Sequence, residues 1–191
     1  MKAQEEKILR EGKVLPGEIL KVGSFLNQQL DVAFIMEMGE EIARSFRDAG
    51  VTKVLTVETS GIALAVAAAR ALGVKAVFAK KHASANLSGD LYTAEVYSYT
   101  HRKTYTIMVA REYIAAEDCV LIVDDFLACG NAAKGLMKIA EEAGARLAGV
   151  SAAIEKGFQG GGDELRARGI RVESLAVIDA FLPDNTVRFR P

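Results

Sequence analysis

The stretch VLIVDDFLACGNAAKG spans Val120 to Gly135 and decides the fold. Its first four residues are all apolar and show no polar alternation, which is typical of a parallel β-strand covered on both faces. Two carboxylates, Asp124 and Asp125, follow this run. Small residues then lead into a helical pattern that begins near Asn131. The order predicts a buried strand, a loop of small residues and an α-helix.

The same stretch predicts a site for a phosphorylated sugar. Residues 128–132 are small enough for a ligand to approach the backbone. The first amides of the following helix lack intrahelical partners and lie at the positive end of the helix dipole, so they suit a phosphate. Two carboxylates beside them suit sugar hydroxyls or a divalent cation. The alternative is an ordinary helix cap, which accounts for one acid but not for two acids followed by a glycine loop.

Composition sets broad limits on the class of protein. The chain has 191 residues, half of them hydrophobic, and a net charge of −1, which fits one globular domain in the cytoplasm. This charge gives no electrostatic support for nucleic acid or membrane binding. Two cysteines make no disulfide framework and two histidines make no metal cluster. The N-terminus shows no apolar signal segment, and no apolar run is long enough to span a bilayer.

Strand and helix patterns alternate along most of the chain, which predicts an α/β fold with a mostly parallel sheet flanked by helices. Glycines at positions 50, 73 and 144 follow helical patterns where a C-terminal cap belongs. The expected strands are 51–57, 74–79, 104–109, 119–123, 147–154 and 172–178. The expected helices are 35–49, 62–72, 132–143 and 163–168.

Two segments fall outside this alternation. Residues 80–103 are polar and show no apolar stripe, so they predict a long loop, which in a compact domain is usually a lid or a disordered segment. Residues 14–31 precede the first sheet strand, and by position they form either a hood over the sheet edge or plain structural packing. The pattern alone leaves both interpretations open.

Two further strand ends carry polar residues. Glu58-Thr59-Ser60-Gly61 joins the strand 51–57 to a helix at the carboxyl edge of the sheet, where open α/β folds bind ligands. By itself such a tetrapeptide is usually a helix cap, but the acid pair at the same edge favours a ligand loop. Lys156 follows the strand 147–154, where a solvent-exposed lysine is the ordinary alternative.

The stretch from Val120 to Gly135 resembles the signature of the type I phosphoribosyltransferases, which bind 5-phosphoribosyl 1-pyrophosphate (PRPP) with Mg²⁺. The resemblance implies that Asp124 and Asp125 contact the ribose hydroxyls and that the lid closes over PRPP. It also implies that Glu58, Thr59, Ser60 and Gly61 receive the pyrophosphate, with Glu58 near the metal. The 5′-phosphate would be held by Ala128, Cys129, Gly130, Asn131 and Ala132. Cys129 departs from the threonine of many members, and since a thiol is a weak donor, the backbone amides would dominate phosphate binding.

The resemblance extends to the purine-using branch of this family. There a lysine after the corresponding strand reads the 6-oxo group, because an ammonium donates only and so separates an oxo acceptor from an amino donor. Lys156 fits this role, with Phe158 stacking on the purine and Leu20 and Asn27 closing over it. The bacterial members that use xanthine match best. The resemblance implies one domain over 1–191, a hood from 14–31 and 155–168, a lid at 80–103 and a homodimer.

The expected reaction is transfer of the phosphoribosyl group from PRPP to N9 of xanthine, giving XMP and pyrophosphate. Other purine phosphoribosyltransferases remain alternatives, although Lys156 argues against adenine. Ala128 stands where hypoxanthine-guanine relatives carry an acid, which argues against those bases and leaves the general base unassigned. A PRPP-sensing purine regulator without catalysis is the alternative of another class. A nucleophilic role for Cys129 is disfavoured because no histidine stands in a neighbouring motif.

Overall fold

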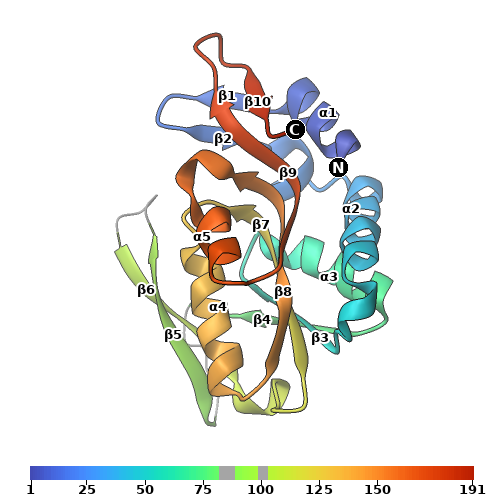
Figure 1. Ribbon diagram of the computed structural model, residues 1–191, viewed down its shortest axis with the longest axis vertical. Coiled ribbons are helices and arrows are strands. Elements are labelled where there is room, and N and C mark those ends of the chain that lie inside the picture. Colours follow the sequence, from blue (N-terminus) through green and yellow to red (C-terminus); the bar gives the residue numbers. More distant parts are fainter. Residues whose placement is uncertain (82–88, 99–102) are drawn as a thin grey trace.

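The computed structural model describes residues 1–81, 89–98 and 103–191. Its centre is a six-stranded sheet, which Figure 1 shows between the helices. The strand order is β10-β9-β8-β7-β3-β4; all neighbours are parallel except β10, which is antiparallel to β9. The strands are β3 (Lys53–Val57), β4 (Lys75–Ala79), β7 (Cys119–Leu127), β8 (Arg146–Lys156), β9 (Val172–Phe181) and β10 (Val187–Phe189). The predicted mostly parallel sheet is confirmed.

Helices cover both faces of this sheet (Figure 1). They are α2 (Val32–Ser45) and α3 (Gly61–Leu72) on one face, and α4 (Asn131–Glu142) and α5 (Gly161–Ala167) on the other. The central strand β7 is buried between them. Leu121 and Val123 belong to the core beneath α2 and α3, whereas Val120 and Ile122 belong to the core beneath α4. The unbroken apolar run of β7 therefore reflects burial on both faces, as expected.

Glycines end the helical segments where the pattern predicted. Gly50, Gly73 and Gly144 have φ values of +67°, +72° and +73°. Residues with a side chain rarely adopt this left-handed conformation. The helix expected at 35–49 differs in detail, because it begins at Val32 and gives way after Ser45 to a short 3-10 turn at Arg47–Ala49.

The segment from 80 to 103 differs most from expectation. Leu91–Ser98 is a strand, β5, that pairs antiparallel with β6 (Lys103–Ala110) in a separate two-stranded sheet. The predicted loop is wrong there, because Tyr92, Ala94 and Val96 alternate with polar residues and bury one face of the strand. Residues 82–88 and 99–102 of the expected lid lie outside the described residues, and a lid role stays a prediction.

The N-terminal residues form a helix, which the sequence did not predict, and a hairpin within the segment expected to form a hood or structural packing. They are α1 (Lys2–Glu11), β1 (Lys13–Leu15) and β2 (Ile19–Lys21), followed by a π-helical turn at Gly23–Asn27. Figure 1 places them beside the β9–β10 hairpin at one end of the molecule. Lys7 anchors this segment, because its Nζ lies 2.5 Å from Asp31 Oδ2 and 4.9 Å from the centre of the Phe34 ring. Among the described residues, no helix is long and apolar enough to cross a membrane.

Candidate active site

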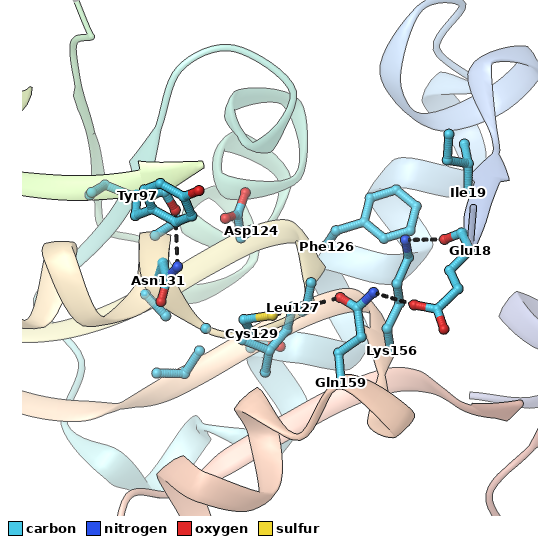
Figure 2. A pocket seen from close by; sticks show the side chains of 18 of the residues that line it. Glu18, Ile19, Tyr97, Asp124, Phe126, Leu127, Cys129, Asn131, Lys156 and Gln159 are labelled. Atoms are coloured by element: carbon cyan, nitrogen blue, oxygen red, sulfur yellow. Dashed lines mark hydrogen bonds between the residues drawn. The ribbon is translucent and has the colours of Figure 1, made fainter. Parts of the chain in front are cut away.

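A cavity of about 490 Å³ opens at the carboxyl ends of β7 and β8 (Figure 2). Its walls come from four parts of the chain: the β1–β2 turn, strands β5 and β6, the end of β7 with the loop into α4, and the end of β8. Parallel α/β sheets bind their ligands at this edge. The cavity is large enough for a small organic ligand.

The loop from Ala128 to Ala132 forms one wall of the cavity. Gly130 has a φ of +76° and caps the N-terminus of α4. The loop is held from behind by α5, since the Gly161 N–H donates to Ala128 O at 3.1 Å. A Cβ on Gly161 would lie 2.3 Å from that same carbonyl oxygen, so the close approach requires glycine. The first amides of α4 lack intrahelical partners and lie at this wall, which suits an anion.

The acid pair lies within β7 rather than beyond its end. Asp124 and Asp125 are consecutive residues of this strand, and their two carboxyl groups interact with each other. Asp124 lines the cavity. Asp125 faces the N-terminal segment, where its Oδ2 accepts a hydrogen bond from Asn27 Nδ2 at 3.5 Å. Asn27, predicted to contact a purine, is therefore brought beside the acid pair.

The charge on Asp124 is only partly compensated by its surroundings. Burial raises the pKa of Asp124 well above its ordinary value; the nearby Asp125 carboxylate raises it further, and Lys81 acts in the opposite direction. The Asp125 N–H donates to Asp124 Oδ1 at 2.9 Å. Burial also raises the pKa of Tyr105 on the cavity wall, with a second contribution from Asp124. An anion held in this way favours a cation or a hydroxyl donor beside it.

The loop from Glu58 to Gly61 lies at the same edge, between β3 and α3. A Cβ on Gly61 would lie 2.8 Å from Asp124 Oδ1 and 2.3 Å from Thr56 Oγ1, so this loop packs directly against the acid. Glu58 Oε1 accepts a hydrogen bond from the Lys81 N–H at 2.5 Å, and the Glu58–Thr59 peptide is cis. The two predicted loops therefore share one edge, as expected. The Glu58 loop lies outside the cavity wall of Figure 2.

Lys156 forms the opposite wall of the cavity. Its Nζ donates to the main-chain carbonyl of Glu18 at 2.7 Å and lies 5.8 Å from the centre of the Phe126 ring. Burial lowers the pKa of Lys156, and the charges of Glu18 and Cys129 partly offset this. The preceding residue, Glu155, is fully buried and accepts two hydrogen bonds from Arg166 at 2.7 and 2.8 Å. The backbone under Lys156 is therefore firmly held.

Three of the predicted purine contacts, Leu20, Asn27 and Phe158, do not line the cavity. Leu20 is 6% exposed and packs in the core beneath the hairpin. Phe158 makes an edge-on contact with Phe181 at 5.3 Å between ring centres and packs against the same core. The aromatic side chain on the cavity wall near Lys156 is Phe126. Contact of Leu20 and Phe158 with a purine stays a prediction.

Several cavity residues were not identified from the sequence. Tyr97 lies near the end of the alternating strand β5, and its main-chain carbonyl accepts a hydrogen bond from Asn131 Nδ2 at 2.9 Å. The period of two in β5 would have placed Tyr97 on a strand. Phe126 follows the acid pair directly. Glu18 and Gln159 carry no local signal, because they meet only across 141 positions of sequence.

Comparison with known proteins finds relatives of this chain by sequence and by structure. No family profile matches the chain. The xanthine phosphoribosyltransferase of Bacillus cereus (strain AH187) is 53% identical over 189 residues, which are 99% of this chain and 95% of that protein. That of Bacillus cytotoxicus is 52% identical over the same extent.

Two solved structures with this architecture are adenine phosphoribosyltransferases. The Giardia lamblia enzyme, complexed with 9-deazaadenine, has a TM-score of 0.68 and 25% identity, covering 77% of this chain and 80% of that one. The Trypanosoma brucei enzyme, in complex with AMP, pyrophosphate and ribose-5-phosphate, has a TM-score of 0.78 and 16% identity, covering 95% and 82%. At 16% identity the second likeness concerns the fold alone.

The parallel sheet, the acid pair and the helix-capping loop define a type I phosphoribosyltransferase, as the sequence predicted. The identity of 53% over nearly the whole length is far above what a shared fold requires. The chain belongs to the xanthine phosphoribosyltransferase family. It is an enzyme of purine salvage that transfers a pentosyl group.

Proposed function

We propose that the chain transfers the 5-phosphoribosyl group of PRPP to N9 of xanthine and releases XMP and pyrophosphate. The observation that carries this proposal is the 53% identity to xanthine phosphoribosyltransferases over 99% of the chain. The cavity supports it, because an acid, a helix N-terminus and a lysine lie around one space. These are the groups that a sugar phosphate and an oxopurine require.

The sugar and phosphate half of the substrate occupies the β7 side in this proposal. Asp124 and Asp125 bind the ribose hydroxyls and stabilise the positive charge that develops at C1′. The amides of the loop 128–132 bind the 5′-phosphate, and the loop from Glu58 to Gly61 receives the departing pyrophosphate. Catalysis is then mostly a matter of positioning and electrostatics, and it needs no protein nucleophile.

Magnesium fits this site as an ion bound together with PRPP. The described residues contain no cluster of three or more histidine, cysteine or carboxylate side chains able to hold a metal ion. Mg²⁺ at phosphate sites, however, commonly uses only one or two carboxylates together with phosphate oxygens. Asp124 fits this need, since its buried charge is incompletely compensated, and Asp125 is the second candidate. The ion would neutralise negative charge on the leaving pyrophosphate.

The base occupies the side of Lys156 in this proposal. The Lys156 ammonium donates to the 6-oxo group, and Asn27 offers both a donor and an acceptor. Leu20 and Phe158 belong to the proposed base contacts, although both pack in the core beneath the hood. Ala128 cannot act as a general base. Because xanthine is acidic, an already ionised base can attack C1′ directly.

PRPP-dependent release of pyrophosphate, measured in parallel with xanthine, guanine, hypoxanthine and adenine, tests the proposal. We expect the highest kcat/KM with xanthine and the lowest with adenine. A preference for adenine would overturn the assignment of the base. Calorimetry with PRPP and Mg²⁺, combined with the turnover assay, distinguishes the enzyme from a PRPP-sensing regulator, because a regulator would bind PRPP without any turnover.

Assembly and location are proposed from the family as well. We expect a cytoplasmic homodimer that uses xanthine and PRPP and binds neither nucleic acid nor membrane. Sedimentation of the purified protein at micromolar concentration tests the assembly, because a monomeric mass would contradict it.

A further inference from the structure

The turn between β1 and β2 lines the base side of the cavity, and Glu18 in this turn makes hydrogen bonds to two other residues of the cavity wall (Figure 2). Its main-chain carbonyl accepts a hydrogen bond from Lys156 Nζ at 2.7 Å. Its carboxylate Oε2 accepts a hydrogen bond from Gln159 Nε2 at 3.1 Å. We call Glu18, Lys156 and Gln159 the clasp. It connects the N-terminal hairpin to the end of β8, and all three residues line the cavity.

The chemistry of the clasp fixes the direction of two donors. A carboxylate only accepts hydrogen bonds, so Glu18 orients the Gln159 amide with Nε2 toward the turn. Gln159 Oε1 then faces the phosphate loop, where the Cys129 thiol lies within weak hydrogen-bond distance, with 4.0 Å between Sγ and Oε1. The Lys156 ammonium has three protons. The Glu18 carbonyl takes one and leaves the others for an acceptor in the cavity.

The backbone at Glu18 supports a role for its side chain. Glu18 has a φ of +60°, a left-handed conformation in which a residue other than glycine is uncommon. Glycine would adopt the turn without strain. What glutamate adds at this position is the carboxylate, and the hydrogen bond of that carboxylate goes to a cavity residue. Strained positions of this kind often lie at functional sites.

We propose that Glu18 is a positioning residue for the acceptor base: it holds Lys156 and Gln159 in place on the cavity wall and thereby sets the affinity for an oxopurine. The inference rests on the proposed function, since the base must lie against Lys156. Glu18 acts through its two partners and has no part in the chemical step. Its loss therefore raises KM for the base more than it lowers kcat.

The test compares Glu18→Gly with Glu18→Gln. The glycine variant keeps the turn and the carbonyl but removes the carboxylate, so we expect KM for xanthine to rise roughly 3- to 10-fold, the effect of losing one hydrogen bond. KM for PRPP should stay within about twofold, because the clasp makes no contact with the acid pair and reaches the phosphate loop only through the weak contact of Gln159 with Cys129 at 4.0 Å. Glu18→Gln keeps an acceptor oxygen, and we expect it to restore most of the affinity for xanthine.

Asn185→Gly is the matched control for relaxing the turn. Asn185 is the other described residue besides glycine with a positive φ, at +63°, and it lies in the β9–β10 turn away from the cavity wall. We expect its KM values to equal those of the wild type.

The variant Gln159→Ala, alone and combined with Glu18→Gly, tests whether Glu18 acts through Gln159. If the two residues act together, the double variant loses no more than about twofold beyond the worse single variant.

An unchanged KM for xanthine in Glu18→Gly would overturn the inference. Equal rises in KM for PRPP and xanthine would overturn it too, because they would indicate general loosening of the hood. The inference would also be overturned if the effects of Glu18→Gly and Gln159→Ala on KM for xanthine simply multiplied in the double variant. Absence of turnover with xanthine in the wild type would instead refute the proposed function. The same variants would then be measured with whichever purine the wild type accepts, so the two failures are distinguishable.

Discussion

The two walls of the cavity are built in opposite ways. The sugar-phosphate wall comes largely from one continuous run, in which Asp124 and the loop 128–132 follow each other along a strand and into a helix. The base wall joins Glu18 to Lys156 and Gln159, which are 138 and 141 positions away in the sequence. Sheet pairing fixes the first wall. Contacts between the N-terminal hairpin and the end of β8 fix the second.

This difference predicts different consequences of mutation. A change on the sugar-phosphate wall affects groups that act on the reacting centre, so it should mainly lower turnover. A change on the base wall affects groups that hold the acceptor, so it should mainly raise KM and change selectivity. The walls can therefore be separated by kinetics.

Replacing both Asp124 and Asp125 by Asn should have the largest effect. Both carboxylate charges are lost while size and hydrogen-bonding shape are kept, so we expect kcat/KM for PRPP to fall by roughly 10³-fold with the fold intact. Steady-state kinetics with varied PRPP measures the loss, and circular dichroism checks the fold. Full activity in this variant would refute the role of the acid pair.

Gly61→Ala should come next. The added methyl group would lie 2.3 Å from Thr56 Oγ1 and 2.8 Å from Asp124 Oδ1, so it must displace the loop from the acid. Misplacement on this scale can lower turnover by roughly 10²-fold. Measurement of kcat with saturating xanthine and PRPP tests this. Gly23→Ala is the control, since its Cβ would meet Gln28 Oε1 at an ordinary 3.4 Å.

Lys156→Ala tests the base wall. Loss of a charged donor to the purine should raise KM for xanthine by roughly 10- to 100-fold. It should also reduce the preference for xanthine over adenine, while KM for PRPP changes little. Lys138→Ala, which removes an exposed lysine from α4, is the control. If kcat fell as strongly as in the Asp124 and Asp125 double variant, the two walls would not be separable.

The same contrast explains how much the sequence could predict. The apolar run, the acid pair and Gly130 are local signals, and the structure places them together as predicted. Helix α1 escaped prediction because its buried side consists of Gln4, Lys7 and Ile8, which make no apolar stripe. The contact of Glu18 with Gln159 depends on how two distant segments pack. No local pattern encodes that packing, so the residues of the base wall could be brought together only by the three-dimensional structure.

The single variant Asp124→Asn should have the smallest effect, and this effect is on stability. The preceding variants lose activity, whereas this one should raise the unfolding temperature. The pKa of Asp124 is raised in the folded state by burial and by Asp125, so its ionisation opposes folding above that pKa. Asn keeps the oxygen that accepts from the Asp125 N–H. We expect the unfolding temperature at pH 7 to rise, which thermal melting detects because each kcal/mol corresponds to about 2–4 °C in a domain of this size. The gain should shrink as the pH falls and vanish below the ordinary aspartate range, where Asp124 is protonated in both states.

Asp118→Asn, also beside β7, is the control with opposite sign. Burial acts to raise the pKa of Asp118, but hydrogen bonds from Lys53, Ala115 and Thr52 lower it overall. Its charge therefore stabilises the fold above the ordinary aspartate pKa, and the variant should melt below the wild type at pH 7. Thermal unfolding of both variants from pH 3 to pH 8 measures the two trends. If Asp124→Asn also melted lower at pH 7, the sugar-phosphate wall would not hold an uncompensated charge, and the electrostatic argument for a cation or hydroxyl partner at Asp124 would fail.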